Sequence, residues 1–262
     1  MSKSINSYFK EYLRITPLSL ALWRTLEADG MKDIKLVHPV LDIGCGFGEF
    51  SGVFFDGTVE VGIDINKKDL VRAGRKKKYK ELIYADAKRL PFRDNSFNTI
   101  VSNSTLEHID QADRVIKEVH RLLRKGGIFV FSVPTDEINN HLLGVRVLKR
   151  MHLNFLARKY VDIYHRIFKH KLILPKNIWE QYVTNCGLKL ISCKSVMSKS
   201  QLEIFEKYLL FSLPTQITQK FFNRRVLFDN EIRVSYLYKN FTKYLQSEGE
   251  DYINAVFVAK KI

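Results

Sequence analysis

The part of the sequence best suited to chemistry is a glycine-rich loop between two carboxylates. In the stretch "LDIGCGFGEF" three glycines recur at every second position, and these are Gly44, Gly46 and Gly48. Glycines let a ligand approach the backbone closely. Asp42 precedes the loop and Glu49 follows it, and a negative charge at the start of a helix opposes the binding of an anion. The loop therefore favours a ligand with positive charge.

The spacing of the glycines excludes two common nucleotide-binding loops. A dinucleotide fingerprint would place its third glycine at position 49, which is Glu49. A Walker-type phosphate loop would continue with Gly-Lys-Ser or Gly-Lys-Thr, and no such sequence follows. The loop is therefore one whose bare backbone packs against a ligand other than a pyrophosphate.

Strand-like runs alternate with helical patterns from Val40 to Pro134, which predicts a parallel sheet covered by helices. The strands are expected in "VLDIG", "VEVGID", "ELIYAD", "FNTIVSN" and "GIFVFSVP", with a helix in "DQADRVIKEVHRLLRKGG". A further helix is expected from Pro175 to Gly187, then a strand, and "INAVFVAKK" forms the last strand. The predicted fold is Rossmann-like α/β, a seven-stranded, mostly parallel sheet with helices on both faces and a helical insertion before the last strand.

The chain is expected to form one main domain with additions. The predicted segments are N-terminal helices at 1–36, a core at 37–197 with a basic lid at about 138–172, a helical insertion at 198–248, and the final core strand at 249–262. The insertion is rich in Phe and Tyr and is too long for an ordinary connection.

The ordered motifs resemble those of class I S-adenosylmethionine-dependent methyltransferases. "VLDIGCGFGEFS" looks like the first motif, "VGIDI" like the second, and "YADAKRLPFRDNSFNTIVSNSTLEHI" like the third and fourth. "VHRLLRKGGIFVFSVP" is similar to the segment that closes the nucleotide half of the sheet. The resemblance covers residues 38–134 closely, and several ordered motifs are more specific than one glycine loop. It implies S-adenosylmethionine as the cofactor.

The resemblance also implies roles for individual residues. Asp64 would accept both ribose hydroxyls of the cofactor. Asp86 and Ala87 would meet the adenine, while Asn103 and Ser104 would lie near the methionine part. The complete implied cofactor set is Asp42, Gly44, Cys45, Gly46, Gly48, Asp64, Ile65, Asp86, Ala87, Asn103 and Ser104.

Two histidines are candidate general bases. Methyl transfer from a sulfonium is an in-line displacement, so positioning contributes up to about 7 to 11 kcal/mol, and a hydroxyl acceptor also needs a base. For His108, in "STLEHI", a role in shaping the cofactor pocket is favoured over catalysis. For His165, in "DIYHRIF", a solvated place in a basic surface is favoured likewise. No metal site is expected, because Cys45, Cys186 and Cys193 show no metal-ligand pairing.

The chain carries a formal net charge of +15, which favours anionic partners. Basic residues gather between Ile138 and Lys176, where Asp162 is the one acidic residue, and large apolar residues are interleaved with them. The basic residues are Arg146, Lys149, Arg150, Arg158, Lys159, Arg166, Lys169, Lys171 and Lys176. Three interpretations stay open: a helical lid, a contact with an anionic membrane or lipid-linked substrate, and, less favoured, a contact with nucleic acid.

The sequence predicts a methyltransferase that acts on a small or lipid-linked molecule. The alternatives are a methyltransferase of RNA or protein, and a non-catalytic module that only binds S-adenosylmethionine. No apolar run reaches the roughly 20 residues of a spanning helix, so a cytoplasmic protein, peripheral at most to the inner membrane face, is expected. The sequence makes no prediction of the oligomeric state or of the atom that is methylated.

Overall fold

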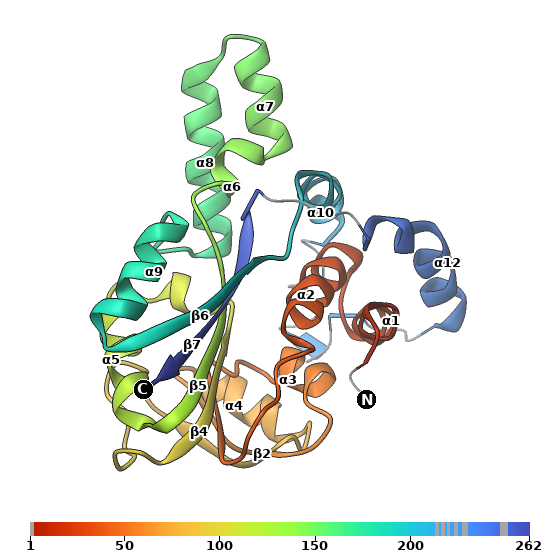
Figure 1. Ribbon diagram of the computed structural model, residues 1–262. Coiled ribbons are helices and arrows are strands. Elements are labelled where there is room, and N and C mark those ends of the chain that lie inside the picture. Colours follow the sequence, from red (N-terminus) through yellow and green to blue (C-terminus); the bar gives the residue numbers. More distant parts are fainter. Residues whose placement is uncertain are drawn as a thin grey trace. The chain divides into compact units, whose positions relative to one another are not determined.

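The computed structural model describes residues 3–212, 215, 218, 221–222, 225–226, 230–246 and 251–262 (Figure 1). The chain divides into two compact units. The helical unit comprises Met1–Lys32, Glu137–Phe168 and Ser195–Ile253, and the sheet unit comprises Asp33–Asp136, Lys169–Lys194 and Asn254–Ile262. Each unit is therefore assembled from segments that are distant in the sequence.

The sheet unit is built on a seven-stranded sheet in the order β3-β2-β1-β4-β5-β7-β6. Its strands are β1 (Val40–Ile43), β2 (Val59–Asp64), β3 (Tyr79–Tyr84), β4 (Phe97–Asn103), β5 (Leu123–Pro134), β6 (Leu188–Ser195) and β7 (Asn254–Lys261). The first five strands pair in parallel, and β7 pairs antiparallel with β5. The predicted Rossmann-like α/β fold, with its mostly parallel sheet, is confirmed.

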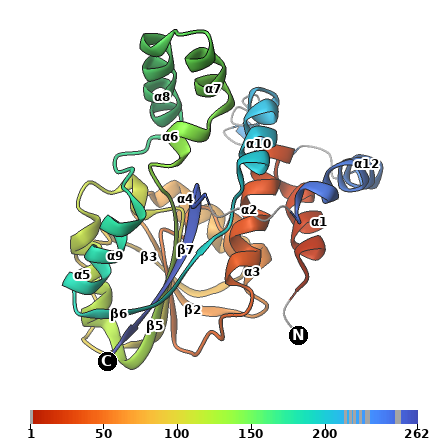
Figure 2. The ribbon, with the colours of Figure 1, turned by 45° about the horizontal axis from the view of Figure 1, so that its top comes forward.

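Helices cover the sheet on both faces (Figure 2). They are α3 (Glu49–Phe54), α4 (Lys67–Gly74), α5 (Ala112–Leu122) and α9 (Lys176–Asn185), with the short 3-10 helix η1 (Leu106–His108). The predicted helical spacing in α5 is confirmed, since Val115, Ile116, Val119 and Leu122 are fully buried. Such an apolar stripe is the face by which a helix packs on a sheet.

One predicted boundary differs from the structure. The helix was expected to continue to "KGG", but α5 ends at Leu122 and β5 begins at once with Leu123. Leu123 pairs with Phe97 of β4, and the pairing then shifts register before Thr99. Gly126 has a φ of +80°, a left-handed conformation that glycine adopts without strain. Long-range strand pairing therefore overrides the local helical pattern.

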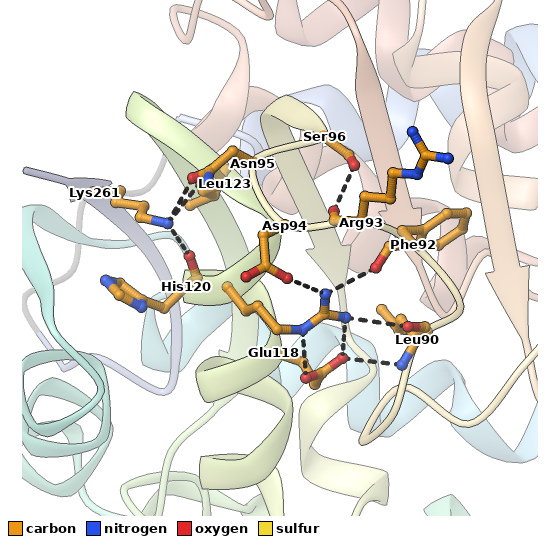
Figure 3. A network of polar contacts seen from close by, with 11 residues as sticks. Leu90, Phe92, Arg93, Asp94, Asn95, Ser96, Glu118, His120, Leu123 and Lys261 are labelled. Atoms are coloured by element: carbon orange, nitrogen blue, oxygen red, sulfur yellow. Dashed lines mark hydrogen bonds and ion pairs between the residues drawn. The ribbon is translucent and has the colours of Figure 1, made fainter.

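Arg121, at the end of α5, ties together the loop before β4 at the amino edge of the parallel strands (Figure 3). Its guanidinium donates to both carboxylate oxygens of Glu118, at 2.8 and 3.0 Å, and to Asp94 Oδ1 at 2.7 Å. It also donates to the carbonyls of Phe92 at 2.8 Å and Leu90 at 3.1 Å. Hydrogen bonding to Arg121 lowers the pKa of Glu118.

Lys261, at the end of β7, plays a similar part beside Arg121 (Figure 3). Its Nζ donates to the carbonyls of His120 at 2.7 Å and Leu123 at 2.9 Å, and to Asn95 Oδ1 at 3.0 Å. An ammonium has three hydrogens to donate, so these three acceptors use its full capacity. At the amino edge of the sheet, the donors of Arg121 and Lys261 are therefore all engaged by acceptors of the same unit.

The helical unit contains α1 (Ile5–Ile15), α2 (Leu18–Met31), α6 (Ile138–His141), α7 (Leu143–Arg150), α8 (Asn154–Phe168), α10 (Lys199–Ser212), α12 (Glu231–Phe241) and the 3-10 helix η2 (Thr242–Tyr244). Helix α2 packs on α1 and α10, and α7 packs on α8. Trp23 of α2 and Phe205 of α10 lie with their ring centroids 4.9 Å apart. These contacts join the amino-terminal helices to a segment almost two hundred residues further along the chain.

The predicted insertion at 198–248 contains α10, α12 and η2. Its positions 213–214, 216–217, 219–220, 223–224, 227–229 and 247–248 lie outside the described residues. The boundaries of the four predicted segments stay a prediction. Among the residues that the structure describes, no helix is both long enough and apolar enough to cross a membrane.

Candidate cofactor site

The predicted cofactor residues of the sheet unit gather where the strand order reverses. Strand β1 lies between β2 and β4, and the connections after these strands diverge at its carboxyl end. Such a switch point opens a crevice that binds ligands in parallel α/β sheets. Asp64 is the last residue of β2, Asp86 and Ala87 follow β3, and Asn103 ends β4. The fold therefore brings loops from four strands to one edge.

The three glycines of the loop after β1 all have a left-handed backbone. The φ angles of Gly44, Gly46 and Gly48 are +74°, +52° and +75°. A Cβ on Gly44 would lie 2.2 Å from Cγ2 of Thr105, whereas a Cβ on Gly46 would meet no atom within 4 Å. Gly44 is thus needed for packing inside the protein, and Gly46 faces open space. That space is what a ligand pressed against the loop requires.

Asp64 connects the end of β2 to this loop. Its Oδ2 accepts a hydrogen bond from the backbone N–H of Gly46 at 2.9 Å, and its Oδ1 accepts one from Asn66 at 2.8 Å. A carboxylate offers about four acceptor positions, so each oxygen retains a lone pair for a further donor. The carboxylate therefore fits the pair of ribose hydroxyls that the resemblance implies.

Asp42 is buried beneath the loop and hydrogen-bonded to a tyrosine. The Tyr79 hydroxyl donates to Asp42 Oδ2 at 2.5 Å. Burial raises the pKa of Asp42 to about 7; the Tyr79 hydrogen bond opposes this rise and the charge of Asp64 adds to it. The Tyr79 ring passes over Gly62 of β2, where a Cβ would come within 2.7 Å of the ring. The sequence analysis missed Tyr79, and its one signal was a glycine inside a strand.

Cys45 lies within the loop as a protonated thiol. Its side chain is buried, and burial, with a smaller contribution from Asp42, raises its pKa far above the ordinary value. A thiol is nucleophilic only as the thiolate. Cys45 therefore contributes backbone and volume to the site rather than a nucleophile.

The loops after β2 and β3 present one apolar and one acidic side chain. Ile65, next to Asp64, is 64% exposed. Asp86 accepts a hydrogen bond from the backbone of Lys88 at 3.0 Å and pairs with its Nζ at 3.5 Å. Ala87 is buried. An apolar surface beside a hydrogen-bonding group is the combination that suits a flat heterocycle.

Asn103 and Ser104 are held in place by Ser132 of β5. The Ser132 hydroxyl donates to Asn103 Oδ1 at 2.9 Å, and the backbone N–H of Ser104 donates to the Ser132 carbonyl at 3.1 Å. Ser104 has a φ of +45°, which is a strained conformation for a residue with a side chain. Such strain persists at sites where the surrounding structure enforces it.

The two candidate bases belong to different units. His108 ends η1 in the sheet unit, and its Nδ1 lies 3.1 Å from the carbonyl of Lys169. His165 belongs to α8 in the helical unit, where its Nε2 lies 2.6 Å from Asn139 Oδ1 and burial lowers its pKa. Among the described residues no cluster of His, Cys, Asp or Glu could hold a metal ion.

Known proteins resemble the chain over this site. Residues 41–131 match the family model of a methyltransferase domain. An uncharacterized protein of Methanocaldococcus jannaschii is 27% identical over 264 residues, 100% of this chain and 88% of that protein. A demethylmenaquinone methyltransferase of Lactobacillus johnsonii is 35% identical over 119 residues, 40% of this chain and 48% of that enzyme. This chain therefore matches about half of that enzyme's length.

A solved structure supports the fold. The S-adenosylmethionine-dependent methyltransferase of Thermotoga maritima superposes with a TM-score of 0.59 at 16% identity, covering 94% of this chain and 92% of that one. At such low identity the likeness concerns the fold.

The family match over residues 41–131, together with the motif order and the fold, identifies a class I S-adenosylmethionine-dependent methyltransferase domain in the chain. S-adenosylmethionine is its cofactor, which confirms the prediction from the sequence. The roles of the individual residues toward that cofactor stay a prediction.

Proposed function

We propose that the protein transfers the methyl group of S-adenosylmethionine to a small or lipid-linked acceptor. When bound, the cofactor supplies both the methyl group and the leaving group. The chain must then hold the acceptor in line and exclude water, since positioning accounts for much of the rate. The observation that carries the proposal is the carboxyl edge of the sheet, where open glycine backbone, Asp64 and a buried Asp42 converge.

In this proposal the cofactor is held from the loops that follow four strands, β1 to β4. Asp64 accepts the ribose hydroxyls, and Asp86 and Ala87 bind the adenine beside the exposed Ile65. The remaining cofactor contacts come from Asp42, Gly44, Cys45, Gly46, Gly48, Asn103 and Ser104. The open space at Gly46 and the lone pairs left on Asp64 support this assignment.

The proposed role of His108 depends on its tautomer. A carbonyl oxygen only accepts hydrogen bonds, so the contact with the Lys169 carbonyl requires a hydrogen on Nδ1 of His108. A neutral ring of this tautomer would carry its lone pair on Nε2, which is 3.9 Å from Glu107 Oε1, whereas a protonated ring would present a donor there. This tautomer supports either a pocket-shaping residue or a base for a hydroxyl acceptor. His165 stays a second candidate.

The apolar surface of the helical unit supports a lipid-linked acceptor. Most of the exposed large hydrophobic side chains among the described residues belong to this unit. Leu210 and Phe211 of α10 are more than 70% exposed, and Phe221 and Phe222 follow in the same segment. The demethylmenaquinone methyltransferase that matches the cofactor half acts on demethylmenaquinone. The proposed location, in the cytoplasm at the inner face of a membrane, suits a lipid-linked acceptor.

The test is a labelling experiment with a cell extract. The protein is incubated with S-adenosylmethionine carrying a radioactive methyl group and with extract separated into lipid, RNA, protein and soluble metabolites. We expect label in the lipid or metabolite fraction, and much less label with an Asp64→Ala control at a limiting concentration of the methyl donor. Label in RNA or protein would overturn the proposed acceptor. Cofactor binding without labelling of any fraction would identify a non-catalytic module.

A further inference from the structure

Helices α7 and α8 form a helical hairpin, residues 143–168, joined by a short turn at 151–153. Figures 1 and 2 show the two helices lying side by side. Gly144 allows this approach, because a Cβ there would lie 2.5 Å from the ring of Tyr160. The hairpin is thus closely packed at its base, where α7 begins.

A buried carboxylate anchors the base of the hairpin to α10. Glu206 of α10 accepts hydrogen bonds from the backbone N–H groups of Leu143 at 2.5 Å and Gly144 at 2.9 Å. It also accepts the Tyr160 hydroxyl at 2.5 Å. The first two donors are N–H groups at the start of a helix, which need such a partner. These hydrogen bonds fix the base of the hairpin to α10.

The opposite end of the hairpin is apolar and uncovered among the described residues. Met151 is 60% exposed and Phe155 is 62% exposed. The exposed apolar side chains of this end, called the tip here, are Val147, Met151, Leu153, Phe155 and Leu156. A cluster of large apolar side chains on a surface marks a place of contact with a protein or a membrane.

The charge around the tip is entirely positive. From Arg146 to Lys159 the sequence contains five basic residues and no acidic residue. Arg146 pairs with Glu203 of α10 at 3.2 Å, and Lys159 Nζ lies over the Phe155 ring at 5.6 Å. No hydrogen bond or ion pair of the described residues engages Arg150 or Arg158. The tip therefore combines an apolar centre with two exposed arginines, Arg150 and Arg158, that no described residue engages.

We infer that the tip of the hairpin docks on an anionic membrane surface. The apolar side chains enter the boundary between headgroups and acyl chains, and the basic side chains contact the lipid phosphates, as in interfacial amphipathic helices. Charge complementarity and the apolar centre together favour this partner over nucleic acid, because a phosphate backbone would leave the apolar side chains of the tip uncovered, and single strands stack on several aromatic side chains where the tip has Phe155 as its one aromatic residue. The inference rests on the proposed function, since a lipid-linked acceptor lies in the same membrane.

Sedimentation with vesicles tests the inference. The wild-type protein is compared on vesicles of phosphatidylcholine and of phosphatidylcholine mixed with phosphatidylglycerol. We expect binding to the anionic vesicles, weakened about tenfold or more by Arg150→Glu with Arg158→Glu, since each basic residue near the surface contributes about 1 kcal/mol. Met151→Ser with Phe155→Ser tests the apolar centre and should weaken binding similarly.

A matched control lies on the sheet unit. Val71 is 64% exposed and Lys125 is exposed, so Val71→Ser with Lys125→Glu makes the same kinds of change elsewhere. The control should bind anionic vesicles much as the wild type does after allowance for its charge. Equal binding by the wild type and both tip variants would overturn the inference. Loss of RNA binding in these variants with unchanged vesicle binding would replace the membrane with nucleic acid.

A failure of the inference can be told from a failure of the proposed function. Calorimetric binding of S-adenosylmethionine and thermal melting should be unchanged in the tip variants, because the changed residues belong to the surface of the helical unit. Label from the methyl donor in lipid, together with unchanged vesicle binding by the variants, would keep the proposed function and reject the tip as docking surface.

Discussion

The two edges of the central sheet differ in how their polar groups are satisfied. At the amino edge Arg121 and Lys261 donate to carboxylates and carbonyls of the same unit, and these contacts use the full capacity of Lys261 (Figure 3). At the carboxyl edge Asp64 keeps acceptor capacity, and Asp42 has a pKa near 7. Polar groups whose hydrogen bonds are all made contribute stability. Unused acceptor positions, a perturbed pKa and backbone strain are instead typical of a binding site.

The largest expected effect concerns the glycine loop. Gly44→Ala places a Cβ 2.2 Å from Thr105 at a φ of +74°. Left-handed strain and overpacking together cost about 2 to 5 kcal/mol of unfolding free energy, measured by urea denaturation. Gly46→Ala is the matched control and should cost about 1 to 2 kcal/mol, because its Cβ would meet open space. Equal losses of unfolding free energy in the two variants would show that the contact with Thr105 adds nothing to the cost of Gly44→Ala.

Asp42 predicts a pH dependence of stability opposite in sign to that of Glu118 at the amino edge, whose pKa is lowered. Its folded pKa of about 7 lies above its ordinary value of 3.8. As the pH rises, the unfolded chain loses this proton first, so stability falls between about pH 4 and pH 7 and is level above. The total change is at most about 4 kcal/mol. In Asp42→Asn this decline should be absent from urea denaturation curves, while the control Asp94→Asn should keep it. An unchanged decline in Asp42→Asn would contradict the assignment.

Asp64 tests the binding capacity of the carboxyl edge. Asp64→Ala removes a charged acceptor of two hydroxyl hydrogen bonds, at a cost of about 1.5 to 3 kcal/mol, or roughly 10- to 150-fold in affinity. Calorimetric titration with S-adenosylmethionine measures this loss. Asp94→Ala, a carboxylate of the amino edge, should bind the cofactor as the wild type does. Unchanged affinity in Asp64→Ala would remove Asp64 from the site.

Arg121 tests the opposite edge, with the smallest effect. Arg121→Met keeps the aliphatic stem and removes five hydrogen bonds. Because the side chain is about a third exposed, we expect a loss of about 1 to 2 kcal/mol in unfolding free energy. Cofactor affinity measured below the melting temperature should not change. A drop in affinity comparable to that of Asp64→Ala would break the distinction between the two edges.

Local patterns sufficed for most strands, for the apolar stripe of α5 and for the place of Asp64 at the end of β2, because burial in a parallel sheet imposes apolar runs that end at its carboxyl edge. They did not suffice for Tyr79, whose contact with Asp42 crosses β2 over Gly62. Asp42 and Tyr79 are 37 residues apart in the sequence, and the register of the strands brings them together. No local pattern specifies that register. Strand pairing, here between Leu123 and Phe97 of β4, also explains why β5 begins earlier than the local helical pattern predicts.

The sequence by itself determined the fold class, which follows from the alternation of strand-like and helical patterns, and the resemblance of its ordered motifs implied the methyl donor. Tertiary structure decided the pKa of Asp42, the contact of His108 with the Lys169 carbonyl and the exposure of Met151 and Phe155. Burial, hydrogen-bond partners and exposure arise from segments far apart in the chain, and they exist only once those segments have packed.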